Sequence, residues 1–284
     1  MRVRWWRLCA WATAAVGVTA ALGAYLTGPV NPASAPRLNT DVRAAVHTTP
    51  HAAVQTPPAM QTTPAVQTAP ALQAYVPPGQ NLSLGASGAA DASVQARLAQ
   101  LGYYPGPVNG TYGADLEEAV WAFKEVQGLP LLGGSSLIGP VMRDDLVNPK
   151  PPPVLVPDGG PNRIEVNQSI QVLVLYQNNH PSVILHVSTG GRYYFCSNGC
   201  GYAITPDGNY KALSYLQGTI TVPLGFMENP VFFIGRTYAI HGGEPVPWYP
   251  DSHGCVRIYD DAVTWFHNDV RIGVTNIYIR GTAP

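Results

Sequence analysis

The chain has 284 residues, a formal net charge of -1 and only 12% charged residues. A chain of this length has room for about two domains and a sizeable buried core. Because charged residues are so sparse, no basic field exists to hold a polyanion, and we expect no nucleic-acid partner. The 29 glycines and 28 prolines exceed the usual share and indicate that part of the chain is linker.

Residues 1–35 have the pattern of an export signal. Arginines precede an apolar run over residues 8–26, and small residues follow at positions 33–35. The run is near the length that spans a bilayer, and Pro36 directly after the small residues disfavours cleavage. An uncleaved membrane anchor through residues 8–26 is therefore the alternative to a cleaved signal peptide.

Residues 36–88 are dominated by Pro, Thr, Ala and Gln and contain a six-residue repeat, visible as 53–58, 59–64 and 65–70. Such a composition cannot build a core, and it favours extended polyproline II structure at about 3 Å per residue. We interpret the segment as a disordered linker that spaces a folded domain from a membrane. Generic disorder without a set length is the alternative.

Residues 89–148 regain helical periodicity. Val94 and Leu98 share one apolar stripe, and a second stripe runs from Ala119 to Val126. Gly102 and Gly128 follow these two predicted helices as C-terminal caps, and Pro140 suits the first turn of a third helix.

This helical stretch resembles a small three-helix peptidoglycan-binding domain at three short motifs, Leu101–Tyr104, Asn109–Gly113 and Ala119–Phe123. The resemblance implies a glycan or peptidoglycan partner. Three tyrosines could stack on a sugar ring or, equally well, pack in the core of the helices: Tyr103, Tyr104 and Tyr112. A bundle that only spaces the rest of the chain is the alternative, since a fold alone does not establish a ligand.

Residues 149–160 begin with a proline run and are predicted to be a linker, and strands dominate from 161 to 284. Short runs rich in Val, Ile, Leu and Tyr predict strands at 163–166, 169–176, 182–188 and 274–279, and a helical pattern covers 260–269. The sequence thus predicts a β-rich domain with one helix near its end.

The segment Ser252–Tyr259 concentrates reactive side chains. If it is extended, one face carries His253, Cys255 and Arg257. The other face carries Val256 and Ile258, which turn toward a core. Gly254 has no Cβ, so a substrate carbonyl could approach the backbone and meet N–H donors there.

A second reactive element, Ile240-His241-Gly242, follows two apolar runs that are separated by the Gly235-Arg236 turn. This arrangement predicts a hairpin that carries His241 toward the thiol of Cys255.

These two elements resemble the catalytic signature of the L,D-transpeptidases of the YkuD type, which cross-link peptidoglycan through a cysteine. The resemblance extends to further motifs at 188–190, 205–208, Met227 and Gly273. It implies that Cys255 is the nucleophile and His241 the proton donor and acceptor. It also implies a β-sandwich-like catalytic domain, so that the whole chain is an α+β multidomain protein. The span from His241 to Ser252 is shorter than in many relatives, and this departure bears on acceptor specificity more than on chemistry.

The remaining residues of the cluster have expected supporting roles. His253 is expected to orient the site, with service as the base as the alternative, because two imidazoles lie near one thiol. The backbone N–H groups around Gly254 and Cys255 are expected to hold the oxyanion, with Gly254 as one donor. Arg257 is suited to a substrate carboxylate such as the side group of diaminopimelate, and a structural ion pair is its alternative. Ser252 is expected to shape the loop and contact substrate.

Besides Cys9 in the apolar run, the chain has Cys196, Cys200 and Cys255. In an oxidising compartment Cys196 and Cys200 can close a small loop over Asn198-Gly199, which would leave Cys255 free. A zinc site and free thiols are the alternatives, but a structural zinc site normally takes four ligands. We therefore expect a disulfide, no metal and no cofactor.

Three functions from different classes follow. The first is an exported L,D-transpeptidase of the cell envelope, acting on peptidoglycan stem peptides and glycan through an acyl-enzyme at Cys255. The second is an L,D-carboxypeptidase in which water attacks the same acyl-enzyme. The third is a non-catalytic peptidoglycan-binding protein. A general cysteine protease is weaker, because nothing in the sequence indicates a groove for protein substrates.

Overall fold

The computed structural model describes residues 75–197, 199–243 and 245–284, which all belong to one compact unit. The expected export signal or anchor at 1–35, with its apolar run at 8–26, lies outside the described residues, as does most of the 36–88 linker. Within the part that is described, no helix is long and apolar enough to cross a membrane.

The helical block contains the three helices that the sequence predicts, together with a short 3-10 turn: α1 (Ala89–Gln100), α2 (Ala114–Gln127), η1 (Leu132–Gly134) and α3 (Pro140–Val147). Helix α2 ends where Gly128 takes a left-handed φ of 77°, which a residue without a Cβ adopts at little cost. Pro140 occupies the first turn of α3, where its missing N–H leaves no hydrogen bond unmade.

The first sheet has five strands in the order β3-β2-β1-β12-β6. Their bounds are β1 (Arg163–Asn167), β2 (Val172–Gln177), β3 (His180–His186), β6 (Gly208–Lys211) and β12 (Asn276–Arg280). Strand β1 pairs antiparallel with β2 and parallel with β12. The sequence predicted that β2 begins at Ser169, but a left-handed φ of 52° at Gln171 turns the backbone and delays its start.

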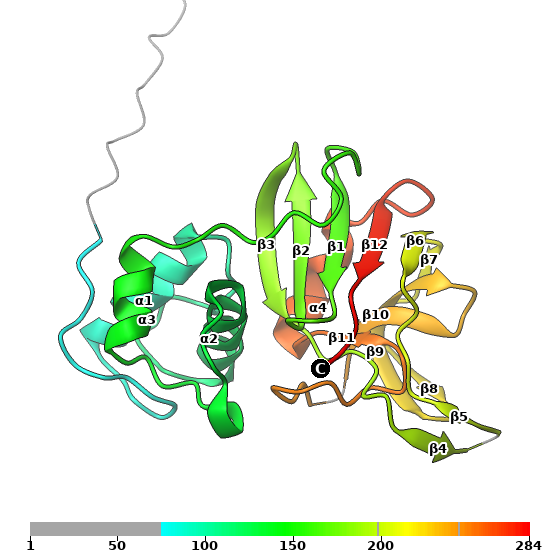
Figure 1. The fold of residues 1–284 in the computed structure, drawn as a ribbon, viewed down its shortest axis with the longest axis horizontal. Coiled ribbons are helices and arrows are strands. Elements are labelled where there is room, and N and C mark those ends of the chain that lie inside the picture. Colours follow the sequence, from blue (N-terminus) through cyan, green and yellow to red (C-terminus); the bar gives the residue numbers. More distant parts are fainter. Residues whose placement is uncertain (1–74, 198, 244) are drawn as a thin grey trace, which may run out of the picture. The chain divides into compact units, whose positions relative to one another are not determined.

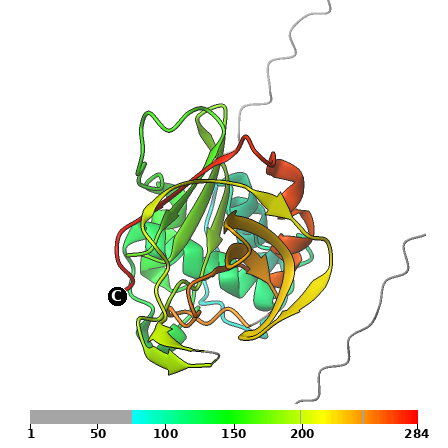
Figure 2. The same cartoon turned by 90° about the vertical axis from the view of Figure 1, so that its right-hand side faces the viewer.

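The second sheet has the order β11-β10-β9-β7, and β8 pairs with β9 beside this path. Its strands are β7 (Ser214–Tyr215), β8 (Thr219–Val222), β9 (Gly225–Ile234), β10 (Tyr238–Gly242) and β11 (Val256–Arg257). A separate hairpin joins β4 (Tyr194–Cys196) to β5 (Cys200–Tyr202), and the chain also contains α4 (Asp260–Phe266) followed by η2 (His267–Asp269). Figure 1 labels these elements, and Figure 2 shows the yellow and orange strands of the second sheet in front of the green strands of the first.

The main core of the β-rich region draws buried side chains from both sheets and from α4. Members with no measurable exposure include Ile164, Leu173, Ile277, Ile240, Val256 and Phe266. The fold is therefore two sheets packed over a common apolar layer, with α4 closing it. This arrangement and the helical block confirm the predicted α+β fold class.

A second core joins the helical block to the outer face of the first sheet. Tyr103 and Phe123 pack edge to face with ring centroids 5.3 Å apart, in the same cluster as Val174 and Ile184. The Ile184 N–H also donates to the Gly102 carbonyl at 2.8 Å. Burial on both faces explains why β2 is a continuous apolar run instead of an alternating one. Since each fully buried side chain of this kind contributes about 1.5–3 kcal/mol, the two parts are firmly joined.

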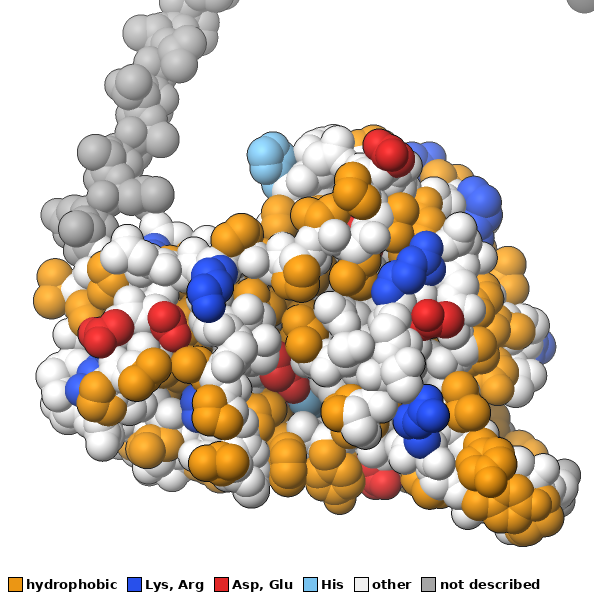
Figure 3. Space-filling view, viewed as in Figure 1, with side chains coloured by type: hydrophobic (Ala, Val, Ile, Leu, Met, Phe, Trp, Pro, Cys, Tyr) orange, Lys and Arg blue, Asp and Glu red, His pale blue; other side chains and the backbone are white. Residues whose placement is uncertain are grey.

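A polar cluster lies where α2 covers β3. The Nδ1 atom of His186 is 2.9 Å from both carboxylate oxygens of Glu125, and its Nε2 is 3.0 Å from the Pro247 carbonyl oxygen. Because a carbonyl only accepts, Nε2 carries hydrogen, and Nδ1 shares a proton with Glu125. Figure 3 shows acidic and histidine side chains in the hollow between the helices and the sheet.

Burial sets the protonation of this polar cluster. Burial opposes charge on His186, yet the charge and hydrogen bond of Glu125, together with Glu118, raise the pKa of His186 to about 9. Burial also raises the pKa of Glu125 to about 7, although His186 acts in the opposite direction, and the pKa of Glu118 to about 8. The Oε2 atom of Glu118 is buried with no hydrogen-bond partner among the described residues. The cluster therefore holds its protons more tightly when the chain is folded.

This proton uptake makes the folded state less stable as pH rises. The pKa of Glu118 in the folded state is about 8 and lies above its ordinary value of 4.5. The contribution of Glu118 to the free energy of unfolding therefore declines as pH rises from about 4.5 to about 8. The contribution of His186 to the free energy of unfolding is fully present below about pH 6.5 and is lost as pH rises through about 9. We expect Glu118→Gln to match the wild type at pH 5 and to be more stable at pH 8.5, by on the order of 2 kcal/mol. Denaturant unfolding at both pH values measures this, and a variant that is less stable at pH 8.5 would contradict the assignment.

Candidate active site

The segment that carries Cys255 is fixed by backbone pairing on two sides. Ser252 donates its N–H to Thr189 at 3.0 Å and accepts from Gly191 at 3.1 Å. Further along, Arg257 and Ser188 exchange two backbone hydrogen bonds of 3.0 and 3.1 Å. On the other side β11 pairs parallel with β10, with His241 opposite Arg257. The reactive segment therefore lies between two extended stretches that come from different parts of the chain.

Two buried hydroxyl groups fix the turn before the cysteine, which we call the nucleophile turn (residues 252–255). The Ser252 hydroxyl donates to the Cys255 carbonyl at 2.6 Å and accepts the Gly254 N–H at 3.0 Å. The Thr205 hydroxyl donates to the Gly254 carbonyl at 2.8 Å and accepts the Gly190 N–H at 2.8 Å. Each hydroxyl thus acts both as a donor and as an acceptor, so the turn is rigid and these polar groups are satisfied.

These hydrogen bonds bear on two expectations of the sequence. The Gly254 N–H was expected to donate to an oxyanion, but in this structure it is occupied by the Ser252 hydroxyl. Ser252 was expected to shape the loop and contact substrate; its hydroxyl holds the turn, and the residue lines the cavity although it is only 1% exposed. The sequence could not show the contact with Gly254, because it depends on how sharply the turn closes.

Gly254 is required for the shape of the turn. Its φ of 142° lies in a region that L side chains rarely adopt. A Cβ placed there would lie 2.6 Å from the Tyr238 ring and 2.8 Å from the Ile204 carbonyl oxygen. This backbone conformation also limits the regular strand β11 to Val256–Arg257, which is shorter than the extended segment that the sequence predicts. The predicted alternation still holds, since Val256 and Ile258 are completely buried.

Cys255 is a free cysteine that is partly exposed on a cavity wall. Its Sγ lies 3.7 Å from the Thr237 carbonyl oxygen, within reach of a weak S–H hydrogen bond. Burial raises the pKa of the Cys255 thiol, and a backbone hydrogen bond at Ala239 and the Arg257 guanidinium only partly offset this effect. The group is therefore a thiol, not a thiolate, at neutral pH.

His241 lines the same cavity from β10 and is 4% exposed. Burial lowers the pKa of His241 to about 4, despite the opposite effect of the Gly242 carbonyl, so the ring is neutral at neutral pH. Its Nδ1 lies 2.7 Å from the Gly242 carbonyl oxygen, which only accepts, so Nδ1 carries the hydrogen and Nε2 has the free lone pair. Among the described residues the structure records no hydrogen bond between His241 and Cys255. Such bonds often form only when substrate is bound.

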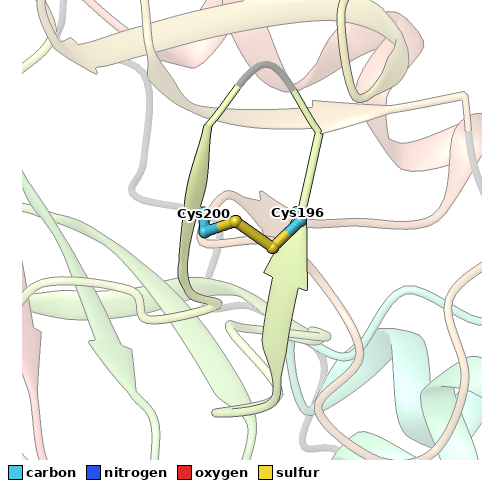
Figure 4. Close-up of a disulfide and its surroundings, with 2 residues drawn as sticks. All are labelled: Cys196 and Cys200. Carbon is cyan, nitrogen blue, oxygen red and sulfur yellow. A yellow bond between two sulfur atoms is a disulfide. The ribbon is translucent and has the colours of Figure 1, made fainter. Parts of the chain in front are cut away.

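His253 is held by two aromatic rings of the segment that forms the β4–β5 hairpin. The centroid of its ring is 4.7 Å from that of Phe195 and 5.6 Å from that of Tyr193, both edge to face. A disulfide between Cys196 and Cys200 closes this hairpin, as Figure 4 shows. The sequence did not predict these aromatic contacts, because neither ring belongs to a reactive motif.

The cavity has a volume of about 400 Å³, which is in the range of small-molecule sites. Its polar wall contains Cys255, His241, His253 and Arg257. Its apolar lining comes mainly from β8 and β9 and the turn between them, with Val222, Leu224, Phe226 and Met227. Of these, only Met227 was singled out by the sequence. Alternating apolar residues at 220–226 are a signal that could have indicated this lining.

Arg257 lies on this wall without an ion-pair partner among the described residues. A structural ion pair was the alternative for this residue. Its guanidinium therefore remains available in the cavity for a carboxylate. In the part of the chain that the structure describes, no cluster of three or more His, Cys, Asp or Glu side chains is arranged to hold a metal ion.

Comparisons with known proteins found similar families for two parts of the chain. Residues 161–279 match the family model of the L,D-transpeptidase catalytic domain, YkuD. Residues 87–131 match the model described as "Putative peptidoglycan binding domain". A search of curated proteins found no match.

Solved structures of L,D-transpeptidases resemble the chain. The enzyme from Xylanimonas cellulosilytica is 28% identical with a TM-score of 0.66, and the match covers 72% of this chain and 100% of that one. The enzyme from Stackebrandtia nassauensis is 16% identical with a TM-score of 0.41, over 72% of this chain and 96% of that one. The family match over residues 161–279 and the likeness to the Xylanimonas enzyme make this part of the chain similar to L,D-transpeptidase catalytic domains of the YkuD type. In the helical block before it, the similarity to the peptidoglycan-binding domain covers α1 and α2 but ends before α3.

The protonation states predict how Cys255 reacts with a simple electrophile. Since its pKa is raised, alkylation by iodoacetamide should accelerate with pH, about tenfold per unit, and keep rising to at least pH 9. Mass spectrometry of the intact protein measures the rate, and Cys255→Ser provides the background because the other described cysteines form the disulfide. A rate that is already constant between pH 6 and 9 would instead reveal a thiolate–imidazolium pair and would contradict this assignment.

Proposed function

We propose that this protein is an exported L,D-transpeptidase that forms peptidoglycan cross-links through an acyl-enzyme at Cys255. The observation that carries the proposal is the shared cavity. One wall presents a free thiol and a neutral imidazole, and the catalytic domain that contains them matches the L,D-transpeptidase family. The donor is a stem tetrapeptide, and the acceptor is an amine of a neighbouring stem.

In the first half-reaction the Cys255 sulfur attacks the carbonyl carbon of the bond before the terminal D-alanine. His241 accepts the thiol proton at Nε2 as the C–S bond forms. Its neutral ring and the free lone pair on Nε2 suit it to this role. When the tetrahedral intermediate collapses, the C–N bond breaks and His241 returns the proton to the leaving amine. The products are D-alanine and a thioester.

In the second half-reaction the acceptor amine attacks the thioester carbon. His241 accepts a proton from this amine, the C–N bond forms and the C–S bond breaks, and the proton returns to the cysteine sulfur. The energy of the original peptide bond is retained in the thioester, so no nucleotide is consumed. Because the Gly254 N–H is occupied, we assign the oxyanion to the next backbone donor along the nucleophile turn, the Cys255 N–H.

Supporting roles follow from the positions of the remaining side chains. Arg257 binds a carboxylate of the donor stem, because a guanidinium without an ion-pair partner offers a bidentate contact. His253 orients the site from between Phe195 and Tyr193. Ser252 acts as a positioning residue through its two hydrogen bonds in the turn.

The site of action that we propose is the cell envelope. Both matched domains belong to families that act on or bind peptidoglycan, and this polymer lies outside the cytoplasm. The disulfide between Cys196 and Cys200 fits an oxidising compartment. The export signal at residues 1–35, cleaved or retained as an anchor through 8–26, would deliver the chain there.

Substitution of the two central residues tests the chemistry. Cys255→Ala should abolish D-alanine release from a stem tetrapeptide, and His241→Gln should lower it by about 10²–10⁴-fold, because a general base is lost. Both variants should unfold at temperatures near that of the wild type. Release of D-alanine by Cys255→Ala at the wild-type rate would exclude the proposal.

Product analysis by mass spectrometry then separates the alternatives. A cross-linked dimer is expected when donor and an amine acceptor are present together. Release of tripeptide alone would indicate an L,D-carboxypeptidase, and absence of any product with retained binding to peptidoglycan would indicate a non-catalytic binding protein.

A further inference from the structure

A second cavity, which we call the seam cavity, lies where the helical block meets the catalytic domain. It has a volume of about 300 Å³ and shares no lining residue with the cavity at Cys255. The helical block contributes Leu129 and Leu131, which fall within the part that matches the peptidoglycan-binding family. The catalytic domain contributes Ile170 and the segment Trp248–Pro250. Each family domain therefore supplies part of one cavity.

Two aromatic side chains stand at this cavity. Trp248 is 38% exposed and Tyr249 is 45% exposed, and their ring centroids are 5.3 Å apart at 75°. Two adjacent aromatic rings that stay partly exposed beside a cavity offer apolar faces on which a ligand can stack.

The backbone beneath these rings is anchored independently of them. The Ser188 hydroxyl donates to the Tyr249 carbonyl at 2.9 Å, and His186 Nε2 donates to the Pro247 carbonyl at 3.0 Å. The Trp248 ring also passes close to Gly134, where a Cβ would lie 2.4 Å from its Cδ1 atom. The loop is thus held by its main chain and by one edge of the tryptophan, while the Tyr249 ring packs edge to face on Trp248 and its hydroxyl has no hydrogen bond among the described residues.

The charges around the cavity indicate which ligand it suits. No lysine or arginine is among the described residues that line it. The one acidic side chain among the described lining residues, Glu125, shares a proton with His186. A carboxylate or phosphate ligand would therefore find no cation here. Exposed aromatic faces with a nearby exposed hydroxyl, that of Ser169, instead suit an uncharged ring that carries polar groups.

We propose that the seam cavity binds uncharged N-acetylated sugar rings of the glycan strand, with Trp248 and Tyr249 as the stacking platform. The identification of the polymer as peptidoglycan rests on the proposed function. The loop that carries the two rings leads directly into the nucleophile turn at Ser252. Glycan held in the seam cavity would therefore be bound next to the segment that presents Cys255, and both family domains would contact it.

A tetrasaccharide of N-acetylglucosamine tests the seam cavity with the full chain. We expect isothermal titration calorimetry to detect binding to the wild type and a loss of about tenfold in affinity for Tyr249→Ala, the usual upper effect of removing one aromatic partner. Tyr249→Phe keeps the ring and should bind like the wild type. Tyr194→Ala, which removes a 60% exposed tyrosine from the β4–β5 hairpin, is the matched control and should also bind like the wild type.

Several outcomes would overturn the seam cavity as a sugar site. They are an absence of binding to the wild type, equal affinity for Tyr249→Ala and the wild type, and an equal loss for Tyr194→Ala. Thermal melting of each variant verifies that it is folded, and Trp248→Phe provides a second test with an expected weaker loss. Acylation of Cys255 by a sugar-free tetrapeptide is measured in parallel. If acylation fails while the sugar binds, the proposed function is wrong, whereas intact acylation without sugar binding rejects only the seam cavity.

Discussion

The chemistry that we propose depends on the rigid turn before Cys255. Four hydrogen bonds to the hydroxyls of Ser252 and Thr205 fix this turn, and backbone pairing with Ser188 and Thr189 fixes its two ends. A cysteine presented in this way loses little conformational freedom when it attacks, so the geometry is largely set before substrate arrives. The cost is that one backbone donor, the Gly254 N–H, is used for rigidity and is no longer free for the oxyanion.

The same buried environment determines the protonation of the reactive pair. Burial raises the pKa of Cys255 and lowers the pKa of His241 to about 4, so both groups are neutral before the reaction. A neutral thiol is a poor nucleophile, but a neutral imidazole can accept its proton during attack. The site therefore favours a mechanism in which the proton moves from Cys255 to His241 during the attack. It disfavours a thiolate–imidazolium pair that exists before substrate binds. It also leaves His241 in the basic form at any pH above about 5.

Local patterns predicted much of the fold. The spacing of Val94 and Leu98, with Gly102 and Gly128 as caps, indicated the helices, and the two apolar runs around Gly235-Arg236 indicated the β9–β10 hairpin. The alternation around Cys255 also indicated which neighbours are buried. What could not be predicted depends on contacts between distant segments. The proline run after α3 indicated a linker between two separate parts, yet Tyr103 and Phe123 share one core with the first sheet. The use of Thr205 in the nucleophile turn and the rings around His253 are contacts of the same kind.

The central claim is that Cys255 carries the donor stem as a thioester. Brief incubation of the full chain with a stem tetrapeptide, acid quenching and mass spectrometry of the digested protein would test it most directly. We predict one adduct on the peptide that contains Cys255, with the mass of the tetrapeptide less that of the released D-alanine, and no such adduct with Cys255→Ala. An adduct on another residue, or rapid D-alanine release with no covalent intermediate at any quench time, would contradict the account.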